Sequence, residues 1–170
     1  MTIITTEIIK ELRDKTGVSV MQCKKALEEA GGDIEKALEV LREIGSAQAE
    51  KKADRTLGGG IVHSYIHSNK KVGVLLELNC ETDFVAGNEE FVSLANDLVL
   101  HIAGMAPDFI SETDVPESDK ADESYKDRVL LNQPFVKNPD ITIEQRINEV
   151  IQKTGEKVAV GRFVRYTVLG

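Results

Sequence analysis

The chain has 170 residues, with 21 basic and 29 acidic side chains and a formal net charge of −8. Its hydrophobic content of 41% is typical of a folded globular protein, and it contains no uncharged apolar run of the ~20 residues that a membrane helix needs. The first ten residues lack a basic stretch followed by an apolar one, so we expect a cytoplasmic protein without membrane contact. The acidic balance argues against direct nucleic-acid binding, which needs clustered Lys and Arg.

Three short helices are predicted at the start of the chain. Thr5 is a candidate N-cap for the first helix, and Gly17 is a candidate stop signal. Ser19 begins a capping-box pattern that opens the second helix. Asp33 can cap the third helix, which we expect to end at Gly45.

Helices this short are stable only when they pack together, so residues 1–45 are expected to form a compact three-helix domain. The Thr16-Gly17-Val18 corner between the first two helices is similar to that of ubiquitin-associated (UBA-like) modules, which usually bind other proteins. Residues 46–56 are mostly alanine and charged residues without a wide apolar face. They predict a solvated linker helix at a domain boundary.

Extended segments follow the linker. Residues 61–67 and 72–80 are rich in β-branched residues and are separated by four turn-forming residues, which predicts a β-hairpin. Residues 157–169 are rich in Val, Phe and Tyr and could add a third strand. A sheet of three strands leaves two edges that can recruit partners, so self-association is expected.

Two longer helices accompany these strands. One is capped by Asn88, and the other begins with the capping box that opens at Thr142. Residues 57–170 are therefore expected to form an α+β core and dimerisation domain, with a small antiparallel sheet and helices on one face. Residues 106–127 hold eight acidic and two basic residues and little apolar periodicity, which indicates a solvated loop, with a functional acidic segment as the alternative.

The histidines and cysteines, which are the residue types that bind metals or act as nucleophiles, do not form a recognisable site in the sequence. His63 and His67 are four residues apart on one predicted strand, ~13 Å along it, and His101 stands alone on a helix. Cys23 and Cys80 show neither a disulfide nor a zinc-ligand pattern. Nucleophile-elbow and phosphate-loop motifs are also missing from the sequence, so we expect no metal, no cofactor and no enzyme activity.

The segment Glu81 to Val85 is unusual because it places Phe84 and Val85 beside two carboxylates, between a strand end and a helix start. Connections of this kind are normally polar. Phe84 could fold inward to cap the core. Alternatively, it could be an exposed wedge that anchors a partner.

Three motifs along the chain occur together in one known family. They are Leu12-Arg13-x-x-Thr16-Gly17-x-x-x-Met21-x-Cys23-Lys24-Lys25-Ala26-Leu27, Asn79-Cys80-Glu81-Thr82-Asp83-Phe84-Val85 and Gln133-Pro134-Phe135-Val136-Lys137. With these motifs the chain resembles bacterial translation elongation factor Ts over almost its whole length.

That resemblance implies a guanine-nucleotide exchange factor of translation. Such a protein binds GDP-bound elongation factor Tu and promotes exchange of GDP for GTP by disturbing the magnesium and nucleotide site, without covalent chemistry. The resemblance implies that the following residues reach the magnesium site: Thr82, Asp83, Phe84 and Val85. It implies that the N-terminal module docks on the partner's G domain through a second set: Arg13, Thr16, Gly17, Val20, Met21 and Lys24.

Longer relatives carry two copies of the α+β core, whereas this chain has one. The resemblance therefore implies a homodimer, joined through edge strands or helices of the C-terminal domain. It leaves open whether Asp83 repels phosphate or competes for polar groups of the partner.

Two other functions are considered. In the first, the UBA-like module is a protein-interaction scaffold and the α+β domain only dimerises. In the second, Glu81 and Asp83 serve an enzyme, although no triad or metal motif accompanies these two carboxylates.

Overall fold

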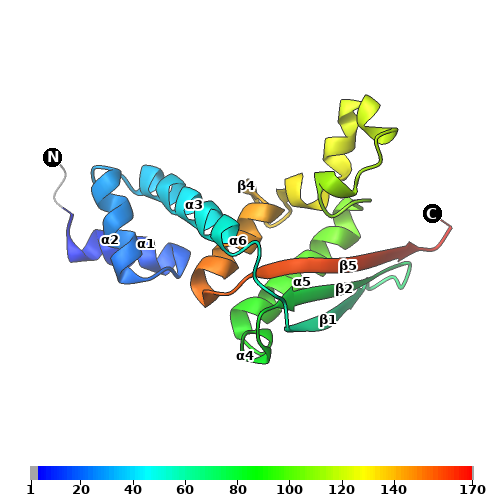
Figure 1. The fold of residues 1–170 in the computed structure, drawn as a ribbon, viewed down its shortest axis with the longest axis horizontal. Coiled ribbons are helices and arrows are strands. Elements are labelled where there is room, and N and C mark those ends of the chain that lie inside the picture. The colour runs from blue at the N-terminus through cyan, green and yellow to red at the C-terminus, as the bar shows by residue number, and fades with distance from the viewer. Residues whose placement is uncertain (1–3, 170) are drawn as a thin grey trace.

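The computed structural model describes residues 4–169, which form an elongated molecule (Figure 1). Helices α1 to α3 lie at one end, and the sheet and helix α5 lie at the other, with α6 between them. This mixture of helices with a small antiparallel sheet confirms the α+β fold class. Within residues 4–169, no helix is both long and apolar enough to span a bilayer.

The three N-terminal helices begin at the predicted caps. They are α1 (Thr6–Thr16), α2 (Val20–Glu29) and α3 (Ile34–Lys51). The side chains of Thr5, Ser19 and Asp33 each accept a hydrogen bond from a backbone N–H in the first turn of the helix that follows. The helices enclose a small hydrophobic cluster that includes Leu12 and Leu27.

Helix α3 does not end at Gly45, so that prediction is wrong. Gly45 is buried where α3 crosses α6 (Ile143–Thr154), and a Cβ there would lie 3.4 Å from Gln152 Oε1. The glycine thus allows the two helices to approach closely, although glycine in a helix interior destabilises the helix by about 1 kcal/mol relative to alanine. Of the expected linker helix, residues 46–51 are the last part of α3, whereas residues 52–56 are not helical. Ala49 packs against the core of the sheet region, so this part of the chain is not fully solvated as expected.

The predicted hairpin and third strand are both present. Strands β1 (Gly59–Ile66), β2 (Val72–Cys80) and β5 (Val158–Thr167) form an antiparallel sheet in the order β1-β2-β5. A β-bulge between Glu77 and Leu78 shifts the register against β5.

The two faces of this sheet differ. Alternate residues of β2 from Val74 to Cys80 are buried in the main core, which α5 (Glu89–Met105) and α6 complete. Helix α6 has the predicted capping box between Thr142 and Gln145 and ends at Gly155. The opposite face of the sheet carries solvent-exposed hydrophobic side chains.

The stretch between α5 and α6 is more ordered than a solvated loop. It contains four 3₁₀ turns, η1 (Glu112–Asp114), η2 (Asp119–Ala121), η3 (Glu123–Arg128) and η4 (Leu130–Asn132). A short hairpin follows, made of β3 (Pro134–Phe135) and β4 (Asn138–Thr142). The guanidinium of Arg128 reaches Asp108 (3.2 Å) and Asp119 (3.3 Å), so part of the acidic excess is neutralised locally.

Candidate functional site

The unusual segment after β2 folds into a single helical turn, α4 (Asp83–Ala86), at the lower end of the sheet (Figure 1). Thr82 is its N-cap, because Thr82 Oγ1 accepts a hydrogen bond from the Val85 N–H (3.4 Å). Phe84 is 84% exposed, whereas Val85 is only 4% exposed and belongs to the core. The exposed-wedge interpretation of Phe84 therefore agrees with the structure, and the inward-folded interpretation does not.

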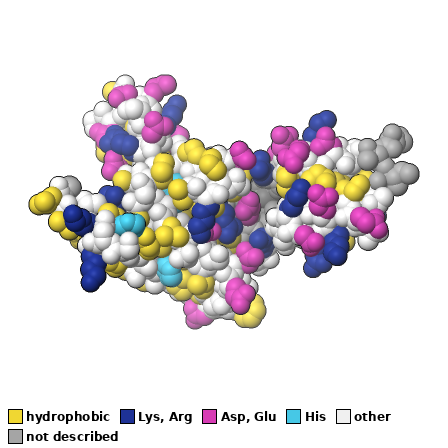
Figure 2. Space-filling model, turned by 180° about the vertical axis from the view of Figure 1, so that it is seen from behind, with side chains coloured by type: hydrophobic (Ala, Val, Ile, Leu, Met, Phe, Trp, Pro, Cys, Tyr) yellow, Lys and Arg dark blue, Asp and Glu magenta, His cyan; other side chains and the backbone are white. Residues whose placement is uncertain are grey.

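Side chains around Phe84 give this end of the molecule a mixed surface. Asp83, next to Phe84 on α4, is exposed to solvent. Figure 2 shows hydrophobic and acidic side chains together at the lower end of the molecule, where α4 lies. An aromatic ring beside a carboxylate, both on a supported turn, can enter a partner's pocket and approach its polar groups.

The start of β1 is packed closely beneath α4. A Cβ on Gly59 would lie 2.6 Å from the carbonyl carbon of Thr82, which no side chain could occupy without movement. The Cys80 thiol donates a hydrogen bond to Thr82 O (3.1 Å), and burial raises the pKa of this thiol. The glycine run 58–60 thus allows close contact between β1 and the turn, and Cys80 is a structural residue.

Two carboxylates connect this turn to the link between α6 and β5. Glu156 accepts hydrogen bonds from the Thr82 N–H (3.0 Å) and the Thr82 hydroxyl (2.6 Å). Glu81 accepts hydrogen bonds from the Lys157 N–H (2.6 Å) and the Arg55 guanidinium (3.1 Å). The hydrogen bond from the Lys157 backbone is the main cause that lowers the pKa of Glu81. We call the Glu81–Lys157 and Glu156–Thr82 contacts the reciprocal clamp.

The corner between α1 and α2 has a defined shape. Gly17 is left-handed (φ 68°), and its N–H donates to Arg13 O (2.7 Å). The Thr16 hydroxyl donates to Leu12 O (2.8 Å). Gly17 also approaches the side chain of Lys153 on α6. Thr16 and Gly17 therefore shape the corner and offer little side chain of their own.

The side chains that this corner exposes to solvent lie mainly at the start of α2. Met21 is 81% exposed, and Val20 beside it is also exposed. Arg13 and Lys24 are exposed as well, and Lys24 lies 3.8 Å from Glu28. The surface is thus an exposed apolar pair with Lys24 about one turn away on α2, and it suits an apolar surface of a partner.

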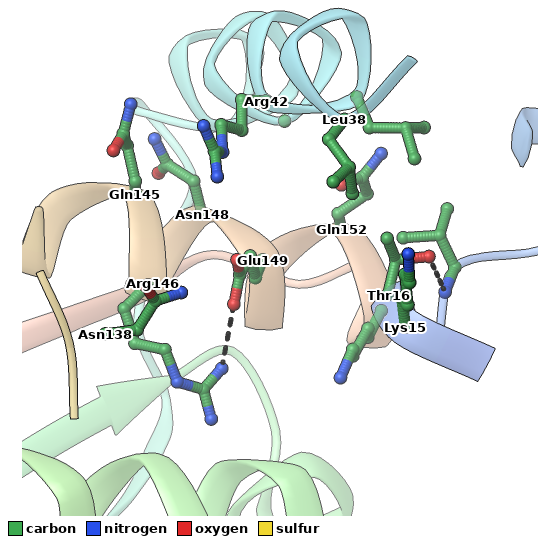
Figure 3. Close-up of a pocket in the computed structure, with 14 residues that line it drawn as sticks. Lys15, Thr16, Leu38, Arg42, Asn138, Gln145, Arg146, Asn148, Glu149 and Gln152 are labelled. Atoms are coloured by element: carbon green, nitrogen blue, oxygen red, sulfur yellow. Dashed lines mark hydrogen bonds and ion pairs between the residues drawn. The ribbon is translucent and has the colours of Figure 1, made fainter. Parts of the chain in front are cut away.

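The two sets of predicted site residues are not brought together. The α1–α2 corner belongs to the helical module and approaches Lys153 of α6, whereas α4 lies below the sheet (Figure 1). A cleft of about 310 Å³ lies between α3 and α6, with Leu38 and Arg42 pointing toward Asn148 and Gln152 (Figure 3). Of the predicted residues, Thr16 lines this cleft, which belongs to the junction between the helical module and the core.

The histidines show no catalytic arrangement. His101 is buried; its Nε2 lies 2.9 Å from Gln133 Oε1, and its Nδ1 accepts the Val136 N–H (3.2 Å). This pattern fits a neutral ring, and burial lowers the pKa of His101. Among residues 4–169, no three His, Cys, Asp or Glu side chains are grouped closely enough to hold a metal ion.

Sequence reasoning missed the residues that support α4. Glu156 and Lys157 lie more than 70 residues from the turn they contact, and Arg55 lies 26 residues before its partner. No local pattern marks these residues, because an acidic or basic residue after a helix stop signal is common in loops. A three-dimensional structure was needed to find them.

Comparison with known proteins identifies the family. The family model described as Elongation factor TS matches residues 3–125. The chain is 45% identical to elongation factor Ts of Thermosipho melanesiensis, over 97% of this chain and 98% of the relative. It is 46% identical to that of Desulforamulus reducens (96% and 88%) and 45% identical to that of Coprothermobacter proteolyticus (97% and 98%). With a family match over most of the chain and near-complete alignments to these bacterial proteins, the chain belongs to the elongation factor Ts family.

Proposed function

We propose that this protein is a guanine-nucleotide exchange factor that binds GDP-bound elongation factor Tu and promotes replacement of GDP by GTP. The family membership supports a role in translation elongation. One structural observation carries the finer proposal: Phe84 stands 84% exposed on a turn that is fixed to the sheet. Such an anchor suits a protein that acts by inserting into another protein's site.

The physical basis of exchange is the magnesium ion that links nucleotide phosphates to the GTPase. A protein that distorts this site weakens nucleotide binding, since the metal neutralises phosphate charge and fixes phosphate geometry. The coupling is reciprocal, so rebinding of nucleotide lowers the affinity of the exchange factor by the same factor. The exchange factor therefore needs no covalent chemistry and no cofactor of its own.

The proposed roles follow the geometry of each residue. Phe84 is the inserted group, and Asp83 beside it acts on the partner's polar groups or phosphate. Thr82 fixes the start of α4, and the buried Val85 anchors the turn in the core. In the helical module, Met21 and its neighbours at the α1–α2 corner provide docking affinity.

Release of a fluorescent GDP analogue from elongation factor Tu tests the function. The protein should accelerate release with saturable dependence on its concentration, and a complete lack of acceleration contradicts the proposal. Met21→Ala should raise the concentration for half-maximal acceleration about five- to thirtyfold with little change in the maximum, the loss typical of an exposed apolar contact. Met105→Ala, an exposed methionine at the end of α5, is the matched control.

The working form is proposed to be a homodimer joined through the open face of the sheet. Val62 (66% exposed) and Tyr166 (73% exposed) lie on this face, and Glu77 and Arg162 on it pair with each other (2.8 Å). The face is thus apolar with its charges internally balanced, and two such faces can pack as sheets ~10 Å apart. The sequence places the joint at edge strands or helices of the C-terminal domain, and the exposed apolar side chains on this face are the reason for proposing the face instead.

Light scattering tests the dimer. A mass near twice 18.7 kDa at micromolar concentration is expected, and a mass of 18.7 kDa contradicts the proposal. Tyr166→Asp should shift the protein toward the monomer, because it places a charge on the apolar face. Val92→Asp, on an exposed position of α5, should leave the mass unchanged.

A further inference from the structure

Helix α4 is too short to be stable by itself. It has four residues, and a helix needs about 12 or more to persist in water without tertiary contacts. Its direction must therefore be set by the contacts at its two ends. At its C-terminal end these are the buried Val85 and Ala86, and at its N-terminal end they are the hydrogen bonds of Thr82.

Glu156 determines how the Thr82 hydroxyl is used. A hydroxyl has one proton and two lone pairs. Donation of that proton to Glu156 Oε1 (2.6 Å) leaves a lone pair to accept the Val85 N–H (3.4 Å). Because the second oxygen of Glu156 accepts the Thr82 N–H (3.0 Å), one carboxylate fixes both the backbone and the side chain of the N-cap.

The other half of the reciprocal clamp holds Glu156 in place. Glu81 precedes Thr82 and accepts the N–H of Lys157, the residue after Glu156. Each connection therefore supplies a carboxylate to the backbone of the other. The Lys157 ammonium donates to the carbonyl oxygens of Ala53 and Arg55, which attaches the clamp to the segment after α3.

We propose that Glu156 is a positioning residue for nucleotide exchange, which acts through Thr82 to hold Phe84 and Asp83 in the direction of insertion. This inference rests on the proposed function, and it assigns to that function a residue outside the predicted site. Glu156 itself does not need to touch the partner. Its effect appears at the step in which the nucleotide site is distorted, because that step depends on where Phe84 lies, whereas docking also uses the separate α1–α2 corner.

The test is the maximal rate of GDP release and, separately, the concentration of exchange factor that gives half of that rate. Glu156→Ala should lower the maximal rate about ten- to a hundredfold, the range expected for a displacement of about 1 Å at a site of insertion. The half-maximal concentration should change less than about threefold. Glu156→Gln, which keeps one acceptor oxygen for the Thr82 N–H, should give an intermediate maximal rate.

Two further measurements separate positioning from simple loss of structure. In a Phe84→Ala background, Glu156→Ala should cause little additional loss, because the two residues act through one element. Hydrogen exchange at the amides of Thr82 and Val85 should become faster in Glu156→Ala, while amides of β2 keep their protection. Glu117→Ala, which removes an exposed ion pair with Lys120 (2.8 Å) in the acidic stretch, is the matched control for loss of a carboxylate.

The possible failures are distinct. If the unmodified protein does not accelerate GDP release, the proposed function and this inference are both overturned. If the unmodified protein is active and folded Glu156→Ala keeps its full maximal rate, the inference alone is overturned. It is also overturned if the losses from Glu156→Ala and Phe84→Ala multiply as independent effects.

Discussion

Replacement of Phe84 by alanine separates folding from function. The side chain offers roughly 200 Å² of surface, of which about 170 Å² is available to a partner. At about 25 cal/mol per Å², its complete burial is worth about 4 kcal/mol, and alanine keeps part of that contact. We therefore expect Phe84→Ala to lower exchange activity by about 2 to 3 kcal/mol, which is about 30- to 150-fold. Because Phe84 is 84% exposed, the free energy of unfolding should change by less than about 0.5 kcal/mol.

The assay compares two quantities on the same preparation. The catalytic efficiency of GDP release from elongation factor Tu is measured with a fluorescent analogue, and the free energy of unfolding is measured by urea denaturation. Phe84→Leu should recover part of the activity, since it restores apolar surface without the ring. Unchanged exchange by Phe84→Ala would refute the wedge mechanism. A large drop in stability would refute the assignment of Phe84 as a residue outside the core.

Three further predictions concern the scaffold. Gly59→Ala should lower the free energy of unfolding by about 1 to 3 kcal/mol and reduce exchange, because its Cβ would lie 2.6 Å from the carbonyl carbon of Thr82, at the start of α4. A variant that is stable and fully active would contradict this close approach. Asp97→Asn should lower the free energy of unfolding in urea by about 1 to 3 kcal/mol, because it removes the charge that pairs with the largely buried Arg146 (3.2 Å) and with Lys137 (2.7 Å) and leaves Arg146 only Glu149 (3.4 Å). The exposed Glu123→Gln should lower it by less than about 0.5 kcal/mol. Burial lowers the pKa of His101, so below about pH 6.5 the unfolded chain takes up a proton that the folded chain does not. The free energy of unfolding should therefore fall as the pH falls from 7.5 to 5.5, and His101→Asn should show a smaller fall in the same titration; equal slopes would contradict this.

Features set by neighbouring residues could be predicted from the sequence. Thr5, Ser19, Asp33 and Asn88 were each predicted as N-caps, and each accepts the expected backbone hydrogen bond. The hairpin and the last strand were also predicted, because turn residues and β-branched runs act over a few positions. Local pattern therefore gave the element order of the N-terminal module and the sheet.

Features set by distant contacts could not be predicted in this way. Gly45 has the sequence character of a helix stop, yet α3 continues because the glycine faces α6 about 100 residues later. The direction of Phe84 is open in the sequence for a similar reason, since Thr82, the N-cap of the turn that carries it, is hydrogen-bonded to Glu156, which lies 74 residues later. The 3₁₀ turns after α5 lack the regular apolar spacing that predicts longer helices.

The unbroken course of α3 has a consequence for partner choice. Its 18 residues span about 27 Å, and they join the helical module that carries the α1–α2 corner to the sheet region that carries α4. A rigid connection of this kind fixes the separation of the two proposed binding surfaces, so a partner gains the benefit of both only if its own surfaces have the same separation. A GTPase with a suitable pocket for the aromatic ring but a different spacing would bind through one surface at a time. Discrimination among related GTPases can therefore come from the fixed junction between the two modules as well as from the side chains on either surface.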